Sequence, residues 1–236
     1  MGARFEEVNI DEAGNRPRLT MRQHLFRRLL HLSISLTVVY YLFTETIGFV
    51  PRKAIIFCLF GLLPAVIEFV RIRKGVLLMG QRPHEINIPG SYLWSTWGAL
   101  IMILVLPQSI VVPTIMIFSV TDPMLGEIRI WRKWLVLPLG FAFITLLYML
   151  FGYPFYLAMV GGLFMVIGES VEAAGKFRIR PELVHLYTKM MKIDRVEIFF
   201  KTDDNFTTQL VPGFILGFIY LSWPGIFPGD FFTPLG

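Results

Sequence analysis

Cysteine is nearly absent from this chain, because Cys58 is the only one among 236 residues. A disulfide framework and a thiolate zinc site each need several cysteines, so both are excluded within one chain. Charged residues are also few, at 17%, whereas hydrophobic residues make up 55% of the sequence. A soluble domain of this length could not bury so many apolar side chains, so the composition indicates a membrane protein.

Several common enzyme motifs are missing as well. The sequence has no glycine-rich phosphate loop of the Walker type, no protein-kinase lysine with an Asp-Phe-Gly segment, no Gly-x-Ser-x-Gly elbow and no His-Glu-x-x-His zinc helix. Soluble nucleotide-binding folds are therefore excluded. A nucleotide would have to be held by basic side chains and carboxylates at helix ends.

Long apolar runs dominate what is present. Runs of about 17 to 25 apolar residues match the roughly 30 Å hydrocarbon core of a bilayer. The predicted fold is an all-α, polytopic membrane helix bundle with about seven transmembrane helices, at 29–50, 54–70, 89–106, 109–121, 134–151, 154–174 and 209–228. Residues 1–19 are predicted to form a polar N-terminal tail. Residues 20–236 are predicted to form a single membrane-embedded domain, with a cytoplasmic amphipathic insertion at about 176–202.

The basic residues fall almost entirely on one side of such a bundle. Seven spans place twenty of the 22 Lys and Arg residues on the side of the N-terminus, and only Arg52 and Lys53 on the other. By the positive-inside rule, the N-terminus is expected to be cytoplasmic. Topology and attraction to anionic lipid explain the net charge of +5, so a nucleic-acid partner is not expected.

Arg27, Arg28 and His31 lie within one helical turn of each other and share much of one face. Guanidinium groups suit phosphate oxygens, and a histidine can donate a hydrogen bond or serve as acid or base. The alternative is that the arginines reach toward lipid head groups while the histidine is bonded inside the bundle. Further along, Glu68 and Arg71 are explained by a simple helical pair.

Two more groups of acids lie near the cytoplasmic boundary. Pro123 disfavours helical backbone at Asp122, so we expect a bent segment that presents Asp122 and Glu127, with a simple helix terminus as the alternative. Glu169 and Glu172 share a helical face, which is costly in a membrane unless they are paired or bound to metal. Structural salt bridges to Lys176 or Arg178 are the alternative there.

The segment 201–207 places two carboxylates and an amide, Asp203, Asp204 and Asn205, directly before the last apolar run. Hard oxygen ligands of this kind bind magnesium beside substrate phosphates. Capping of the last helix is the alternative, although a cap needs only one such residue.

In this order the features resemble the family of CTP-dependent polyprenol and lipid kinases, which contains dolichol kinase, phytol kinase and a CTP-using diacylglycerol kinase. The resemblance spans most of the chain. Arg27-Arg28-Leu29-Leu30-His31 is similar to the family's Arg-Lys-x-x-His, Glu68 with Arg71 to its Glu-x-x-Arg, Thr121-Asp122-Pro123 to its Gly-Asp-Pro, Glu169 with Glu172 to its paired acids, and Asp203-Asp204-Asn205-Phe206-Thr207 to its Asp-Asp-Asn-Leu-Thr.

The resemblance implies a kinase that transfers the γ-phosphoryl group of CTP, or of another nucleoside triphosphate, to the hydroxyl of a polyprenol-like or dolichol-like isoprenoid alcohol. Magnesium is the expected cofactor, with Asp122, Asp203, Asp204 and Glu172 as candidate ligands. Candidate nucleotide-binding residues are Arg27, Arg28, Asn205, Thr207, Arg129 and Lys133. Candidate catalytic residues are Asp203, Glu169 and His31.

The expected location is a multi-pass position in the plasma membrane of a prokaryote or the endoplasmic reticulum of a eukaryote, with the site facing the cytoplasm. The expected partners are the lipid alcohol, the nucleotide and the bilayer. The oligomeric state is left open, with a homo-oligomer among the alternatives. Two other functions stay open: cytidylyl transfer from CTP to a lipid phosphate, and a small membrane transporter or scramblase.

Overall fold

The structure is a computed structural model that describes residues 21–78, 81, 86, 89–171 and 204–232. The predicted tail at 1–19, the insertion at about 176–202, Asp203 and Glu172 lie outside these residues. The described elements, in chain order, are α1 (Met21–Ile34), η1 (Ser35–Leu42), β1 (Thr46–Ile47), β2 (Val50–Pro51), α2 (Arg52–Ile56), η2 (Phe57–Leu62), α3 (Leu63–Lys74), α4 (Ser91–Val105), α5 (Gln108–Trp131), η4 (Lys133–Leu135), α6 (Val136–Leu150), α7 (Phe155–Val171), α9 (Asp204–Ser222) and η5 (Pro224–Ile226).

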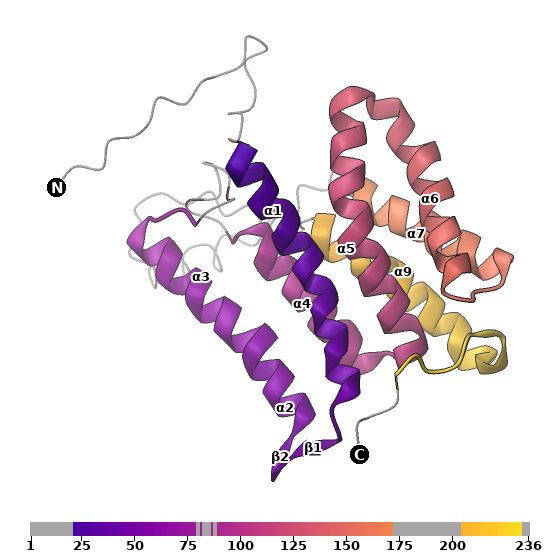
Figure 1. The fold of residues 1–236 in the computed structure, drawn as a ribbon, viewed down its shortest axis with the longest axis horizontal. Helices are drawn as coiled ribbons and strands as arrows, with labels where there is room; N and C mark the ends of the chain where they lie inside the picture. Colours follow the sequence, from indigo (N-terminus) through magenta and orange to yellow (C-terminus); the bar gives the residue numbers. More distant parts are fainter. Residues whose placement is uncertain (1–20, 79–80, 82–85, 87–88, 172–203, 233–236) are drawn as a thin grey trace, which may run out of the picture.

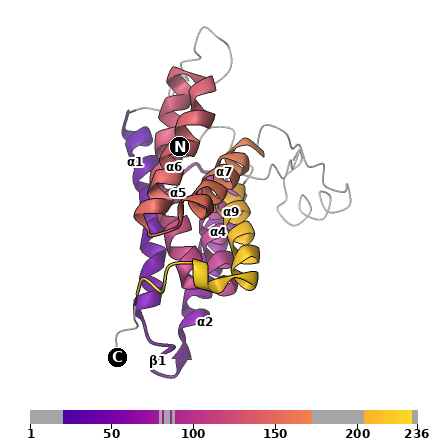
Figure 2. The same ribbon diagram turned by 90° about the vertical axis from the view of Figure 1, so that its right-hand side faces the viewer.

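The predicted all-α class is confirmed, because the two short strands only close a hairpin between η1 and α2. The helices overlap the predicted apolar runs, but the first one, predicted at 29–50, begins at Met21, and its helical structure ends at Leu42 before the hairpin. The π-helical turn η2 joins α2 to α3 in one continuous helix. Figure 1 shows this long helix beside α1 and α4, with α6 and α7 on the opposite side of the bundle. Figures 1 and 2 place the hairpin at one end and the start of α1 at the other.

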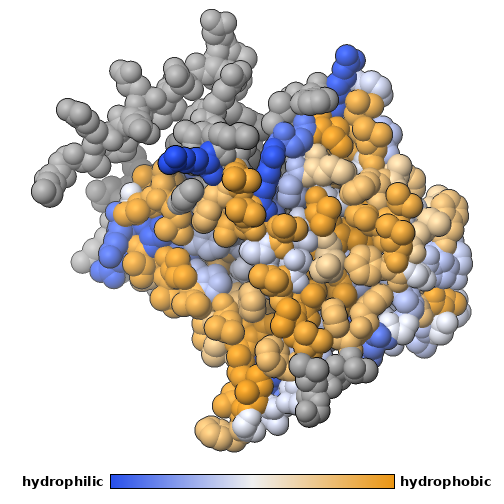
Figure 3. Space-filling model, in the orientation of Figure 1, coloured by the Kyte–Doolittle hydropathy of each residue, from blue (hydrophilic) through white to orange (hydrophobic). Residues whose placement is uncertain are grey.

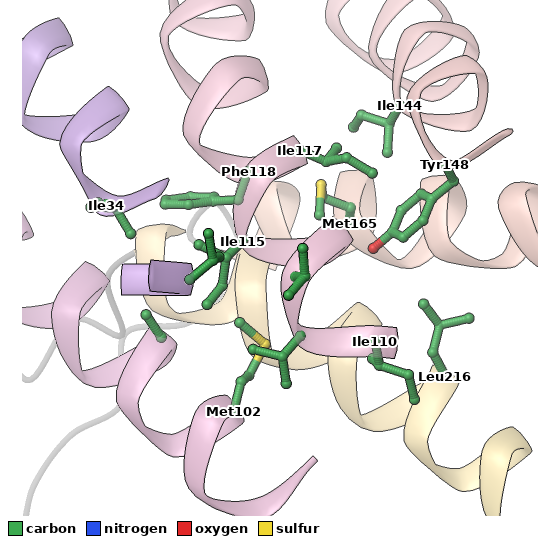
Figure 4. Close-up of a cluster of buried hydrophobic side chains, with 14 of the residues drawn as sticks. Ile34, Met102, Ile110, Ile115, Ile117, Phe118, Ile144, Tyr148, Met165 and Leu216 are labelled. Atoms are coloured by element: carbon green, nitrogen blue, oxygen red, sulfur yellow. The ribbon is translucent and has the colours of Figure 1, made fainter. Parts of the chain in front are cut away.

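The core lies where α1, α4, α5, α7 and α9 meet. Helix α9 packs against α7, α4 and α5, while α1 packs against α5 and α4. Figure 4 shows the buried apolar side chains of this region, among them Met102, Ile115 and Phe118. It also contains a buried polar pair, because the hydroxyls of Thr114 and Tyr148 lie 3.0 Å apart. Close packing of these buried side chains sets how the helices lie against one another.

The predicted bend at Asp122 is wrong. The expected span ended at 121 with a bend at Asp122, but α5 runs unbroken from Gln108 to Trp131 and contains Pro123. A proline inside a helix removes one backbone hydrogen bond and crowds the preceding turn. Packing beyond the proline offsets this loss, because Leu125 is buried and Ile128 packs against the core.

The last helix also begins earlier than expected. Helix α9 starts at Asp204, whereas the apolar pattern suggested a start near 209. Its first turn is held against α7, where the Thr207 hydroxyl donates a hydrogen bond of 2.8 Å to the Gly168 carbonyl. Tertiary contact therefore extends the helix into a polar segment.

The surface of the bundle is strongly apolar. Large hydrophobic side chains are exposed along α1, at Leu25, Leu29, Leu32 and Leu36, and along α3. Figure 3 shows apolar residues over the middle of the molecule and hydrophilic residues along its upper edge. Two helical segments, Arg52–Lys74 and Gln108–Ile128, are long and apolar enough to cross a membrane, and four shorter apolar helices accompany them.

Candidate functional site

A buried pair of titratable side chains joins α1 to α5. The Nδ1 atom of His31 lies 3.1 Å from Oδ2 of Asp122, and the two side chains are 6% and 16% exposed. The approach angle is poorer than that of a good hydrogen bond.

The same turn of α5 also fixes the histidine ring. Phe118, one helical turn before Asp122, meets the His31 imidazole edge to face, with 6.2 Å between the ring centroids. Phe118 is completely buried, and Figure 4 shows it reaching from α5 toward Ile34 of α1. The imidazole is therefore held at two points by one face of α5.

Basic groups lie on α1 one turn before His31. The Arg28 guanidinium forms an ion pair with Glu127 of α5, and both side chains are nearly half exposed. Arg27 differs, because its Nη1 atom is buried and has no hydrogen-bond partner within the described part of the chain. A buried guanidinium nitrogen without an acceptor is costly, so it suits an anionic ligand.

A second polar contact joins α7 to α9. Glu169 is 6% exposed, and the Thr208 hydroxyl donates a 3.2 Å hydrogen bond to its Oε2 atom. The helices touch here through Gly168, because an added Cβ would lie 2.7 Å from the carbonyl oxygen of Thr207. The Thr207 hydroxyl, a predicted nucleotide contact, is engaged in this helix crossing.

These two contacts lie at the same end of the bundle. The Thr121 hydroxyl, next to Asp122, is 3.9 Å from the sulfur of Met165, one turn before Glu169. On the far side of α9, the Gln209 amide donates to the Ser95 carbonyl of α4 over 3.2 Å. We call this end, where α1, α4 and α9 begin and α3, α5 and α7 end, the polar end.

A third polar group at this end was only partly predicted. The expected pair of Glu68 and Arg71 is present, with Nε to Oε2 at 2.9 Å and Nη2 to Oε1 at 2.5 Å. Glu68 also accepts hydrogen bonds from the Gly90 backbone and the Tyr92 hydroxyl. Arg71 donates to the Val76 and Ile86 carbonyls, each over 3.2 Å. Tyr92 was missed because its partner lies 24 residues earlier in the chain.

The remaining predicted residues are placed only in part. Arg129 lies in the last turns of α5 and Lys133 begins η4, so the straight helix carries both beyond Asp122 toward the tip of the bundle. Asp204 and Asn205 form the first turn of α9. The side chains of these four residues are not described.

The described residues do not by themselves form a magnesium site. No group of three or more His, Cys, Asp or Glu side chains among them could hold a metal ion. Asp122 is the only predicted ligand whose side chain is described, and its Oδ2 faces the His31 imidazole. Of the other predicted ligands, Asp203 and Glu172 lie outside the described residues, and the side chain of Asp204 is not described.

The polar end thus brings together the His31–Asp122 pair, the buried Glu169, and a guanidinium nitrogen of Arg27 that has no acceptor among the described residues. Comparisons with known protein families, with curated proteins and with solved structures found no match to this chain, so no family assignment follows from them.

Proposed function

We propose that this chain is an integral membrane kinase that transfers the γ-phosphoryl group of CTP, or of another nucleoside triphosphate, to the hydroxyl of a polyprenol-like lipid alcohol. The observation that carries the proposal is the contact of His31 with Asp122, one helical turn from Arg27, whose Nη1 atom is buried. This arrangement places a proton acceptor close to a guanidinium that can donate hydrogen bonds to phosphate.

The membrane setting is supported by the apolar surface. Contiguous exposed hydrophobic side chains are rare on soluble proteins and usually mark contact with a partner or with lipid. Here they extend along α1 and the continuous helix from Arg52 to Lys74. In our proposal all seven helical segments cross the bilayer, several of them short, and the polar end faces the cytoplasm as the positive-inside rule predicts.

The chemistry fits the residue types at the polar end. Phosphoryl transfer needs little covalent help, and catalysis depends on positioning and on neutralising charge on the transferring oxygens. Arg27 supplies a buried donor for phosphate, and Arg28 supplies a second cation nearby. A lipid alcohol would reach this level from the bilayer, whereas the nucleotide would arrive from the cytoplasm.

The nucleotide and the metal come from the sequence resemblance alone. CTP is proposed because of the matches at Arg27–His31 and Asp203–Thr207. Bound magnesium would neutralise charge on the nucleotide phosphates, and Asp203, Asp204 and Glu172 are its proposed ligands. Asp122 was predicted to join them, but its contact with His31 favours another role.

Lipid analysis tests the proposal directly. Purified protein in nanodiscs would be incubated with magnesium, CTP or ATP, and a panel of long-chain alcohols that includes polyprenols and diacylglycerol. We expect a monophosphorylated lipid from wild type and less than a hundredth of it from Asp203→Asn. Equal product from both proteins would contradict the metal assignment.

The nucleotide product distinguishes the proposed kinase from the alternative enzyme, a cytidylyltransferase. Release of CDP together with a lipid phosphate supports the kinase. Release of pyrophosphate together with a CDP-lipid would instead identify a cytidylyltransferase acting on a lipid phosphate. If no acceptor in the panel yields a product, a transporter or scramblase is favoured instead.

A further inference from the structure

We infer that Asp122 is a positioning residue for His31, and that Nε2 of His31 is the atom that accepts the hydroxyl proton of the lipid acceptor. This inference rests on the proposed function. It moves Asp122 from the predicted magnesium ligands to the proton-transfer apparatus, and it chooses His31 as the base among three candidates, the others being Asp203 and Glu169.

The first support is the direction of the imidazole. Nδ1 is the nitrogen that lies 3.1 Å from Oδ2 of Asp122, and the negative charge of that carboxylate favours the tautomer whose proton is on Nδ1. In a neutral imidazole the other nitrogen, Nε2, then carries the lone pair and is the acceptor. The pairing with Asp122 therefore selects the tautomer that a general base needs.

The second support is how firmly the ring is held. Phe118 and Asp122 lie one turn apart on α5 and contact the same imidazole, one through its ring and one through its carboxylate. His31 itself is only 5% exposed. A side chain fixed at two points costs little further ordering when the reaction begins.

The third support is the charge around Asp122. The His31 imidazole lies 3.1 Å from Oδ2 of Asp122, so it occupies the side of the carboxylate from which a cation would otherwise approach that oxygen. The nearest acid along α5 is Glu127, which is already paired with Arg28. The carboxylate of Asp122 therefore faces an imidazole that it can orient, whereas Glu127 is occupied by Arg28.

The proposed step balances as follows. The lipid oxygen attacks the γ-phosphorus, and the bond between that phosphorus and the bridging oxygen breaks, with its electron pair leaving on the nucleoside diphosphate. The hydroxyl proton passes to Nε2 of His31 as the new O–P bond forms. The imidazolium is stabilised by the Asp122 carboxylate and later releases the proton to water. Arg27, one turn of about 5.4 Å away along α1, donates to the phosphate.

A double-mutant cycle tests the assignment. We expect His31→Gln to lower kcat at least about 100-fold, because general bases contribute about 10² to 10⁴. Asp122→Asn should lower kcat about 10-fold to 100-fold, as loss of an orienting partner does. The double variant should match His31→Gln alone, and the magnesium concentration for half-maximal rate should stay within twofold of wild type in all three.

The opposite pattern would overturn the inference. If Asp122 binds magnesium, Asp122→Asn will raise the half-saturating magnesium concentration tenfold or more, and its effect will multiply with that of His31→Gln. Glu45→Gln serves as the matched control, since it removes a carboxylate at the opposite end of the bundle. Thermal unfolding of each variant separates lost positioning from lost folding.

Nitrogen NMR gives a readout that needs no activity. With ¹⁵N-histidine in the full chain in nanodiscs, the His31 signal is identified by its absence in His31→Gln. We expect wild type to show a protonated Nδ1 and a bare Nε2, and Asp122→Asn to shift toward the opposite tautomer. An unchanged tautomer would overturn the positioning role. If wild type phosphorylates no lipid, the proposed function and the base role fail together, while the tautomer result still decides whether Asp122 positions His31.

Discussion

A single hydrogen atom at Gly168 sets how closely α7 and α9 approach at the polar end. An alanine Cβ there would lie 2.7 Å from the Thr207 carbonyl oxygen and 2.8 Å from the Thr208 Cα. Both are backbone atoms, so relief requires one helix to move away. The Thr208 hydroxyl bond to Glu169 lies at the same crossing and would be strained with it.

Gly168→Ala is therefore expected to destabilise the protein by about 1 to 3 kcal/mol, the usual cost of overpacking. Gly126→Ala is the matched control, because an added Cβ at that helical position meets nothing within 4 Å. The control should be neutral, or stabilising by up to about 1 kcal/mol from helix propensity. Unfolding in mixed micelles measures both, and equal losses in the two variants would contradict the close crossing.

Tyr153 compensates for a proline in α5. Pro113 has no N–H to donate to the Ser109 carbonyl, and the Tyr153 hydroxyl donates to that oxygen instead over 2.6 Å. We expect Tyr153→Phe to cost about 1 to 3 kcal/mol, because a buried carbonyl loses its donor. Tyr156→Phe, at an exposed phenol, should change the unfolding free energy by less than about 0.5 kcal/mol.

A Pro113→Ala background provides the cross-check. It restores a backbone N–H that can satisfy Ser109 within the helix. The cost of Tyr153→Phe should then fall by more than half. If the cost is the same in both backgrounds, the hydroxyl does not compensate for the proline.

Among the elements, α3 depends on an ion pair that sequence spacing could predict. Glu68 and Arg71 are three residues apart and form the expected pair, yet both are nearly fully buried and also bind the segment leading into α4. Removing one partner of a buried ion pair leaves the other charge buried and uncompensated. The pair therefore fixes how α3 joins α4.

We expect Glu68→Gln to lower the unfolding free energy by about 3 to 5 kcal/mol. Glu45→Gln breaks the Arg52 pair, whose acid is 75% exposed, and should cost no more than about 1 kcal/mol. Chemical denaturation compares the two. Equal losses of unfolding free energy in Glu68→Gln and Glu45→Gln would contradict the role given to the buried pair. So would a larger loss in the double variant Glu68→Leu with Arg71→Met than in Glu68→Gln.

Local sequence signals predicted the helices well and their ends less well. The apolar runs overlap the described helices, because helices pack through apolar side chains. The run predicted as one span at 29–50 is an exception, since its helical part ends at Leu42 and a β-hairpin follows. The same signals ended one helix at Asp122 and began another near 209. Both boundaries are set by packing partners distant in sequence, which local patterns do not contain.

At the candidate site, too, local spacing predicts some features, and packing between distant segments decides the others. The shared face of Arg27, Arg28 and His31 follows from helical spacing, and the structure places the three on α1 as expected. The contact of His31 with Asp122 does not follow, because it depends on α1 and α5 packing antiparallel at one register. A bent segment at Pro123 would have presented the carboxylate elsewhere.

For the whole molecule, the proposed topology makes a prediction about sidedness. In a Cys58→Ser background, a membrane-impermeant maleimide should label Phe49→Cys only from outside the cell, because Phe49 is 96% exposed at the β1–β2 hairpin. It should label Arg132→Cys, at the opposite end of the bundle, only from the cytoplasm. Labelling of both positions from one side would contradict a membrane-spanning bundle with the polar end inside.

The central claim is that the polar end transfers a terminal phosphoryl group to a lipid alcohol. The most direct measurement uses CTP labelled with ³²P at the γ-phosphate and with ¹⁴C in the cytosine ring, incubated with magnesium, a polyprenol and the purified protein in nanodiscs. The account predicts that ³²P enters the lipid fraction, that ¹⁴C stays in the aqueous phase, and that Arg27→Gln lowers the transfer at least about 10-fold. Entry of ¹⁴C into the lipid, or no entry of either label, would contradict it.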